Sequence, residues 1–301
     1  MLNSVLITGA TGYLGRFFLD AVEKAGDIEF ALLVRNKATI NKELGERGAV
    51  LEVNELFSDT TVLRRFSAIV HLAFARTWEG ADLADSLTFT KELAAVAKVS
   101  RCSFMNISSR SVYGSGSENG RPWCETTSVA KPETTYALAK FASEEVVSAI
   151  YESCEDAYFT NIRLGSLAGF DFNQRIVSRF VDRVISQQPI VVKAPDNMFS
   201  FLDVRDAAEG ILSLLRRPSR KWATIYNLGI DRAVSLIGLA QIVNDRANNY
   251  GYSSVKIVVE DGVANNFDLM DSKRIQEDTD WHPSFDYVDI VDSIYKFKIG
   301  K

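Results

Sequence analysis

The sequence predicts an α/β fold, with a doubly wound parallel sheet followed by a smaller C-terminal α/β part. Short apolar runs, typical of strands buried on both faces, alternate with segments of helical periodicity along the chain. A second observation is the glycine spacing after the first apolar run, at Gly9, Gly12 and Gly15. Together these features predict a first domain over residues 1–165, with strand and helix contributions from about 201–229, and a second domain over 166–301.

The first strand begins at Val5 and enters a glycine turn, TGATGYLG at 8–15. In a βαβ unit that binds a dinucleotide, the first glycine permits a sharp turn and the second lets backbone approach the pyrophosphate. The third lets the helix pack closely on the strand, and the helix N-terminus presents free N–H groups to the phosphates. The helix continues as an apolar face formed by Phe17, Phe18, Ala21, Val22 and Ala25. We therefore expect a dinucleotide site here; the alternative is a tight strand–helix turn without a ligand.

The second strand, Glu29–Val34, ends at Arg35 and Asn36, where a dinucleotide fold meets the adenosine ribose. An acidic side chain at this point suits the 2′-hydroxyl of NAD, whereas a cationic side chain suits the 2′-phosphate of NADP. Arg35 therefore predicts NADP(H), and Arg16, just past the glycine turn, is placed to assist. The alternative is that both arginines are solvated surface residues.

The later segments continue the alternation of strands and helices. Up to residue 169 we expect strands at 49–53, 68–73, 102–107 and 159–164, helices at 83–99 and from a Thr134 or Thr135 cap onward, a loop at 115–132 and a turn at 165–169. Beyond it we expect helices at 173–187, 206–215 and 236–249, the last capped by Ser235, and strands at 189–192, 199–204, 225–228 and 255–259. These elements are sufficient for a parallel sheet and a second, smaller core.

Polar side chains gather where ligands of such sheets bind, beyond the carboxyl ends of the strands. Ser108 and Ser109 follow the fifth predicted strand. On the next helix, Tyr136 and Lys140 are four residues apart and share one face. A nearby ammonium group lowers the pKa of a tyrosine, which can then exchange a proton with a substrate oxygen. Taken alone, the pair is also what an ordinary helix surface shows, and His71 is expected to be a core residue.

Composition excludes several classes of protein. The chain has 301 residues, 47% hydrophobic and 24% charged, as ordinary globular proteins do. Its net charge of -5 gives no reason to expect nucleic acid or an anionic membrane as a partner. We expect no signal peptide before the first strand, and no apolar run reaches the ~20 residues of a membrane span. The three cysteines lack metal-site spacing and predict idle thiols in a reducing, cytoplasmic compartment.

Nine short segments carry a resemblance that covers the whole chain. They are TGATGYLG at 8–15, HLA at 71–73, ISSRSVYG at 107–114, YALAK at 136–140, RLGSLAG at 163–169, FLDVRDAA at 201–208, YNLG at 226–229, DSKR at 271–274 and WHP at 281–283. In this order and spacing they resemble the extended short-chain dehydrogenase/reductases, also called the NAD-dependent epimerase/dehydratase family, which modify sugar nucleotides. The resemblance implies a Rossmann-type sheet with a smaller substrate-binding part.

The resemblance implies three catalytic residues. Ser109 would hydrogen-bond the substrate oxygen, Tyr136 would act as general acid or base, and Lys140 would hold the nicotinamide ribose and tune Tyr136. With the strand-end residues already named, the expected cofactor-binding set is Gly9, Thr11, Gly12, Tyr13, Leu14, Gly15, Arg35, Asn36, Glu55, Leu56, Leu72, Ala73, Phe74, Ser108, Tyr136, Lys140 and Gly165. In this set, Glu55-Leu56 falls where the family often has an aspartate and an aliphatic residue near the adenine. The nicotinamide would carry the hydride, and no metal is expected.

Departures from the family pattern reduce the number of reactions that we expect. The 4,6-dehydratases carry an Asp-Glu pair after the catalytic hydroxyl residue, and epimerases that act beside a keto group commonly carry a cysteine in this segment. Here Arg110 and Ser111 stand instead. Because 4-epimerases usually keep NAD and an acidic residue after the second strand, Arg35 favours an NADPH-dependent reductase of a keto sugar. The alternatives are an NAD-dependent nucleotide-sugar 4-epimerase, a reductase of a non-sugar ketone or aldehyde, and a dinucleotide-sensing regulator without catalysis.

The expected substrate is a nucleotide-activated sugar, but the family's diphosphate-binding arginines are missing. Many relatives carry an arginine two residues before the Phe of FLDV, where this chain has Phe199, and a second family arginine has no match near Asn265 and Asn266. The candidate substitutes are Arg175, Arg179, Lys193 and Arg232. The family resemblance also suggests a homodimer joined through a helix at about 84–100 and the helix that carries Tyr136.

Overall fold

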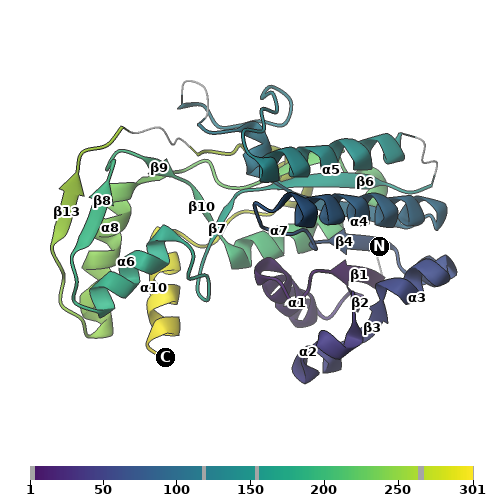
Figure 1. Ribbon diagram of the computed structural model, residues 1–301, viewed down its shortest axis with the longest axis horizontal. Helices are drawn as coiled ribbons and strands as arrows, with labels where there is room; N and C mark the ends of the chain where they lie inside the picture. Colours follow the sequence, from purple (N-terminus) through teal and green to yellow (C-terminus); the bar gives the residue numbers. More distant parts are fainter. Residues whose placement is uncertain (1–3, 117–119, 153–155, 264–267, 301) are drawn as a thin grey trace.

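The computed structural model describes residues 4–116, 120–152, 156–263 and 268–300. It has a larger part, at the right in Figure 1, and a smaller part at the left that carries the C-terminus. The larger part is a seven-stranded parallel sheet with helices on both faces. The smaller part gathers three helices against two paired strands. The predicted α/β class with a doubly wound parallel sheet is confirmed.

The strand order of the central sheet shows at which edge a ligand would bind. Its strands are β1 (Ser4–Thr8), β2 (Glu29–Val34), β3 (Ala49–Glu52), β4 (Ala68–His71), β5 (Ser103–Ser109), β6 (Phe159–Leu164) and β11 (Ile225–Leu228). They lie in the order β11-β6-β5-β4-β1-β2-β3, and all neighbouring pairs are parallel. The order reverses between β1 and β4, and ligands of open α/β sheets bind at such a reversal. The turn after β1 and the segment after β4 therefore face the same crevice.

Helices cover both faces of the sheet. They are α1 (Tyr13–Ala25), α2 (Lys42–Glu46), α3 (Val53–Ser58), α4 (Gly80–Val99), α5 (Thr135–Tyr151) and α7 (Val204–Arg216). Phe18 of α1 and Ile211 of α7 belong to one core, whereas Leu93 of α4 and Val147 of α5 belong to the core of the opposite face. The side chain of Thr134 accepts a hydrogen bond from the N–H of Ala137 and so begins α5 at one of the two caps expected.

The smaller part has its own core. Its elements are α6 (Ile176–Ile185), β8 (Ile190–Lys193), β9 (Met198–Phe199), β12 (Val234–Ser235), α8 (Leu236–Arg246), β13 (Ile257–Glu260) and α10 (Tyr287–Lys298). Val181, Leu239 and Ile294 pack in this core, and Ser235 caps α8 as expected. The strands β7 (Ser166–Ala168) and β10 (Phe201–Asp203) pair in parallel, and helix α9 (Lys273–Thr279) packs near β11. This arrangement brings α6 and β10 close to the sheet edge.

Several predicted elements need correction. The segment 165–169, predicted as a turn, contains strand β7, because it pairs with β10 from a distant part of the chain. The strand predicted at 199–204 is divided at Ser200, whose hydroxyl donates to the carbonyl of Ile230, and Asp203 already caps α7. Strand β3 ends at Glu52 because Glu52 and Glu55 form a capping box that starts α3. Such long-range pairings and caps are weakly marked in a local pattern.

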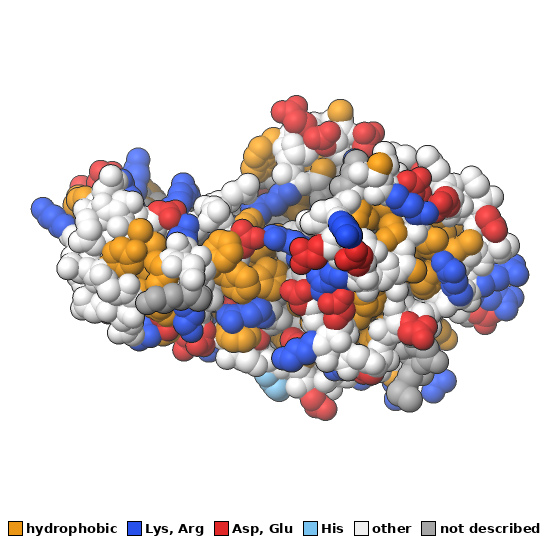
Figure 2. Space-filling view, turned by 90° about the horizontal axis from the view of Figure 1, so that it is seen from below, with side chains coloured by type: hydrophobic (Ala, Val, Ile, Leu, Met, Phe, Trp, Pro, Cys, Tyr) orange, Lys and Arg blue, Asp and Glu red, His pale blue; other side chains and the backbone are white. Residues whose placement is uncertain are grey.

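The surface view in Figure 2 shows Lys and Arg intermixed with Asp and Glu on the face it displays. Across the four described ranges, no helix is both long and apolar enough to cross a membrane. In the same ranges, no group of three His, Cys, Asp or Glu side chains has a geometry that could hold a metal ion. Cys102 and Cys124 are free thiols, the first of them buried, and Cys154 lies outside the described residues.

Candidate active site

The glycine turn has the close backbone packing that the sequence predicts. Gly9 adopts a φ of +72°, and a Cβ there would lie 2.7 Å from the nitrogen of Ala73. A Cβ on Gly15 would lie 2.1 Å from the carbonyl oxygen of Gly9, so both positions require glycine. Gly12 is the N-cap of α1 and supplies no side-chain cap, and the first turn of α1 has no acidic residue. The free N–H groups of this helix end therefore suit a dinucleotide pyrophosphate.

Residues after β7 fold across the glycine turn. The Tyr13 hydroxyl donates to the carbonyl of Phe170 at 3.0 Å, and its ring stacks on Phe172 with centroids 4.3 Å apart. Burial raises the pKa of Tyr13. Arg16 forms an ion pair with Asp171 at 2.8 Å. The guanidinium of Arg16, expected to assist at the ribose end of β2, is thus held by the segment that follows β7.

The ribose end of β2 carries two cations that differ in their pairing. Arg35 is exposed, and no hydrogen bond or ion pair of its side chain is found among the described residues. The Lys37 ammonium lies 2.7 Å from the Glu55 carboxylate. Hydrogen bonds from the Glu52 N–H and from Lys37 lower the pKa of Glu55. The side chain of Asn36 accepts from the N–H of Ala38. Glu55, expected near the adenine, is therefore already paired, whereas Arg35 is available to an anion.

Five further residues expected at the cofactor lie in three settings. Leu56 and Leu14 are buried in the cores, and Leu72 packs against the core under α1. Phe74 stands edge-on to the ring of Tyr136, with centroids 6.4 Å apart. Gly165 lies against Gly229, so that a Cβ would come within 3.1 Å of its Cα. Only Phe74 in this group contacts one of the expected catalytic side chains.

Ser109 and Tyr136 meet at the carboxyl end of β5. The Ser109 hydroxyl accepts hydrogen bonds from the N–H and the hydroxyl of Ser111. It also lies near enough to the Tyr136 phenol to lower its pKa. Burial raises the pKa of Tyr136, while the charge of Arg76, the hydrogen bond to Ser109 and the charge of Arg175 lower it. The net shift is upward. Tyr136 therefore holds its proton at neutral pH and can donate it.

Lys140 lies deeper than the sequence suggests. Its ammonium donates to the carbonyl of Ile107 at 2.7 Å and lies 3.9 Å from the centroid of the Phe74 ring. Burial lowers the pKa of Lys140 to about 7, against the opposing charge of Glu144. The expectation that Lys140 lowers the pKa of Tyr136 is wrong for this structure. Arg76 and Arg175 are the cations that act on the phenol.

A buried ion pair lies beneath Lys140 and was missed by sequence reasoning. Glu144, one helical turn further along α5, binds the guanidinium of Arg163 at 2.8 Å, and both side chains are at most 6% exposed. The Ser108 hydroxyl donates to Glu144 at 2.5 Å. The side chain of Ser108 is therefore directed at this ion pair. The spacing of four between Lys140 and Glu144 is the signal that was available in the sequence.

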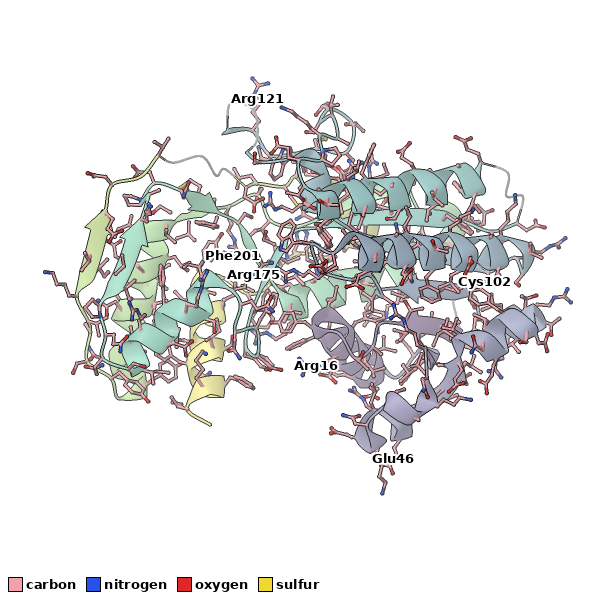
Figure 3. All side chains as sticks on the ribbon, viewed as in Figure 1. Arg16, Glu46, Cys102, Arg121, Arg175 and Phe201 are labelled. Atoms are coloured by element: carbon pink, nitrogen blue, oxygen red, sulfur yellow. The ribbon has the colours of Figure 1, made fainter. Side chains whose placement is uncertain are left out.

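A cavity of about 210 Å³ adjoins these groups on the side of the smaller part. Its walls are Arg110, Ser166, Gln174, Arg175, Ile176, Arg179, Phe199, Phe201 and Asp268. Figure 3 shows Arg175 and Phe201 close together at the junction of the smaller part and the sheet. Of the four suggested diphosphate ligands, Arg175 and Arg179 line the cavity and Lys193 and Arg232 do not. Asn265 and Asn266 lie outside the described residues.

Two arginines of the cavity lack a full set of partners. The Arg110 Nη1 atom forms an ion pair with Asp268 at 3.1 Å, but this contact does not have the geometry of a hydrogen bond. The Nε atom of Arg175 is buried without a hydrogen-bond partner among the described residues. Burial and repulsion from Arg76 and Arg110 lower the pKa of Arg175 to about 10. Buried polar groups are usually paired, so this cavity is arranged for an anion.

Comparison with known proteins defines the family. The model of the NAD dependent epimerase/dehydratase family matches residues 5–229, so the chain belongs to this family. No curated protein matches the chain.

Many solved structures share the fold. One is a UDP-N-acetylglucosamine 4-epimerase from Bacillus cereus, at 21% identity and a TM-score of 0.78 over 97% of this chain and 98% of that chain. Others are a UDP-glucose 4-epimerase from Thermotoga maritima (14%, TM-score 0.79) and a UDP-glucuronic acid 4-epimerase from Bacillus cereus (16%, TM-score 0.79), each over 99% of both chains.

Proposed function

We propose that the protein is an NADPH-dependent reductase that acts on a keto group of a nucleotide-activated sugar. The observation that carries the proposal is that Ser109 and Tyr136 are neighbours at the carboxyl edge of the sheet, with the Tyr136 ring edge-on to Phe74 and the Lys140 ammonium over the Phe74 ring. This pair adjoins the crevice that the glycine turn forms with the segment after β4. It is the arrangement that a carbonyl requires for hydride and proton delivery.

Each side chain has one task in this reaction. The bound dinucleotide supplies the hydride to the carbonyl carbon. Ser109 orients the carbonyl oxygen by a hydrogen bond, and Tyr136 gives that oxygen its proton. The raised pKa of Tyr136 keeps the proton on the phenol until the transfer. The charges of Arg76 and Arg175 then stabilise the phenolate that remains, because opposite charges nearby favour the ionised form.

The preference for NADPH rests on the end of β2. The residues that follow this strand are Arg35, Asn36 and Lys37, and none of them is acidic. A 2′-phosphate at this point gains a charge-assisted hydrogen bond from Arg35. Arg16 has no part in the proposal, because it is paired with Asp171.

Two observations support the nucleotide-sugar substrate. The structural neighbours carry names of enzymes acting on UDP-sugars, and the chain aligns with them over nearly its full length. The cavity beside Tyr136 supplies Arg175 and Arg179 at the start of α6, where Phe199 stands in place of the family's arginine. A diphosphate suits such guanidinium groups, which bind phosphate oxygens in pairs.

A nucleotide-sugar 4-epimerase is the second candidate, favoured by the names of the three neighbours. In this reaction Tyr136 would take a proton from a sugar hydroxyl and later return it. The same residues serve both reactions, so the cofactor distinguishes them: an epimerase retains NAD and needs no added reductant.

The experiment uses NADPH that carries deuterium at the reactive carbon, with 4-keto sugars linked to UDP or dTDP. A reductase consumes the cofactor in equal amount to the product and places deuterium on the new alcohol carbon. Interconversion of UDP-sugars without added cofactor would instead establish the epimerase. Reduction of simple ketones but of no nucleotide-linked sugar would overturn the proposed substrate.

We further propose a homodimer through α4 and α5, which lie side by side on one face of the sheet. Val99 of α4 and Leu138 of α5 are 76% and 57% exposed. Light scattering on the purified protein would show twice the chain mass, and Leu138→Glu would reduce it to one chain; a monomer in the wild type would contradict the proposal.

A further inference from the structure

The residues between β7 and α6 connect the glycine turn with the cavity. On the side of the glycine turn, the Tyr13 hydroxyl donates to the carbonyl of Phe170, and the Tyr13 ring stacks on the Phe172 ring with centroids 4.3 Å apart. On the side of the cavity, the guanidinium of Arg175 lies 5.1 Å from the centroid of the same Phe172 ring. One aromatic side chain therefore contacts both the helix that follows the glycine turn and a cation of the cavity wall.

Arg175 depends on aromatic rings for its position. Its guanidinium also lies over the ring of Phe201, at 6.0 Å, and its Nε atom is buried without a hydrogen-bond partner among the described residues. Burial, and repulsion from Arg76 and Arg110, lower the pKa of Arg175. The Arg76 guanidinium itself lies 5.2 Å from the centroid of the Phe172 ring. Because the face of an aromatic ring attracts cations, Phe172 offsets the repulsion between Arg76 and Arg175.

The backbone around Phe172 is held by contacts with α1. Asp171 adopts a φ of +57°, a left-handed conformation that residues other than glycine rarely occupy. Such a conformation persists where surrounding contacts impose it. Here the contacts come from three of the first five residues of α1, which are Tyr13, Arg16 and Phe17. The conformation of this segment therefore depends on the start of α1.

We propose that Phe172 is a positioning residue that couples the cofactor site to the substrate cavity, through Tyr13 on one side and Arg175 on the other. The proposal rests on the function proposed above and adds a communication between its two ligands. The free N–H groups at the start of α1 become fixed when they bind a pyrophosphate, and Tyr13 is the first residue of this helix.

Fixing Tyr13 fixes the Phe172 ring that stacks on it, and with it Arg175, which then stands in place for the diphosphate of a nucleotide sugar. The segment has to be ordered only once for both ligands. Each ligand should therefore strengthen the binding of the other, and by the same factor.

The test measures the binding of UDP-glucose by titration calorimetry, with and without saturating NADPH. The two compounds do not react with each other, because UDP-glucose has no keto group. In the wild type, NADPH should raise the affinity for UDP-glucose at least ~5-fold, the lower end of usual coupling between sites. In Phe172→Leu the factor should fall below ~2-fold. A factor below ~2-fold in the wild type, or an unchanged factor in Phe172→Leu, would overturn the proposal.

Two further variants separate coupling from a general loss of structure, which would weaken binding under both conditions and leave their ratio unchanged. Phe172→Tyr keeps the aromatic ring and should retain the factor of the wild type. Arg16→Gln is the matched control, because it removes an exposed ion pair between the same helix and the same segment and should change the factor less than ~2-fold. A loss in Phe172→Tyr as large as that in Phe172→Leu would contradict the role of the ring.

Hydrogen–deuterium exchange with NADPH alone tests the first half of the coupling without any sugar. Exchange of the amides in residues 170–175 should slow several-fold in the wild type and much less in Phe172→Leu, with α8 of the smaller part as the internal reference. NADH takes the place of NADPH if it binds more tightly, because the pyrophosphate is common to both. Cofactor binding with unchanged exchange in residues 170–175 would overturn the proposal.

The same measurements separate this proposal from the function on which it rests. Failure of both UDP-glucose and dTDP-glucose to bind would reject the proposed nucleotide-sugar substrate. The exchange measurement would then still decide whether the glycine turn is coupled to Phe172. Conversely, binding of either nucleotide sugar with the same affinity in the presence and absence of cofactor would reject the coupling and leave the proposed substrate in place.

Discussion

The catalytic edge of the sheet and the adjoining cavity differ in whether their buried charged side chains have hydrogen-bond partners. At the edge, Lys140 donates to the carbonyl of Ile107, and Glu144 binds both Ser108 and Arg163. In the cavity, buried nitrogen atoms of Arg110 and Arg175 lack aligned partners. An unpaired buried charged group costs more free energy than an unpaired neutral one. The charged groups of the edge are therefore satisfied without a ligand, whereas the two arginines of the cavity gain partners when an anion binds. Removing groups from the two regions should therefore affect different properties.

The largest effect is expected for Tyr136→Phe, at the catalytic edge. Loss of the phenol proton should lower kcat by ~10²–10⁴ with a small change in KM, because general acid catalysis acts in the transition state. Steady-state kinetics on the keto-sugar substrate measures both constants. The control is Tyr252→Phe, a tyrosine packed against the core of the smaller part. An unchanged kcat in folded Tyr136→Phe would remove Tyr136 from the mechanism.

The two regions should also differ in stability. Glu144→Ala leaves the buried Arg163 without its partner and should lower the free energy of unfolding by ~3–5 kcal/mol. Arg175→Met removes a cation that has no carboxylate bound to it, so stability should stay level or rise by ~1 kcal/mol while substrate affinity falls. Urea unfolding gives both values. Equal destabilisation by the two changes would contradict the contrast drawn here.

Cofactor choice should depend on Arg35. Arg35→Asp removes the cation and introduces the charge that suits a free 2′-hydroxyl. NADPH affinity is expected to fall ~10–100-fold, the value of one or two charge-assisted hydrogen bonds, while NADH affinity holds or increases. Arg16→Gln is the control. Because Arg16 is ion-paired with Asp171, its loss should change NADPH affinity little. If Arg16→Gln lowers NADPH affinity more than Arg35→Asp does, the assignment of the 2′-phosphate to Arg35 is wrong.

The low pKa of Lys140, about 7, predicts a pH dependence of cofactor binding. Below this pH the ammonium is already charged and can donate hydrogen bonds to the ribose of the proposed cofactor. Above it the free protein loses the proton that the complex requires, so affinity should fall by up to tenfold per pH unit. Binding is measured by the fluorescence of NADH. NADH has no 2′-phosphate, so no change in phosphate protonation contributes to the pH profile. Lys140→Arg should flatten the profile, and a flat profile in the wild type would contradict the role of Lys140.

The smallest effect is expected at the surface. The side chains of Arg16 and Asp171 are 48% and 32% exposed, and such ion pairs contribute at most ~1 kcal/mol. Asp171→Asn should therefore shift the free energy of unfolding by less than ~1 kcal/mol. A loss as large as that of Glu144→Ala would show that the segment after β7 is a structural support of the glycine turn.

The parts of the site that the sequence predicted are local. The glycine turn lies within one strand end and one helical turn, so its spacing defines it. Ser109, Tyr136 and Lys140 also belong to short local motifs, but the family resemblance and not their spacing singled them out. Strand β7 was missed because its only marker is pairing with β10, much later in the chain.

The electrostatics were predicted less well. Lys140 was expected to act on Tyr136 through their spacing, but its ammonium turns to the carbonyl of Ile107. The charges that do act, Arg76 and Arg175, come from loops on either side of the crevice. Likewise, Arg110 and Asp268 meet only in the folded chain. Such contacts depend on tertiary packing, which no local pattern records.

The most direct test of the account is the identity of the cofactor in the purified protein. A denatured sample would be analysed for released dinucleotide, and the ligand-free protein titrated with NADPH and NADH. An NADPH-dependent reductase should retain little cofactor and should bind NADPH much more tightly than NADH. Stoichiometric, tightly held NAD would contradict it and establish the 4-epimerase as the better reading of the same residues.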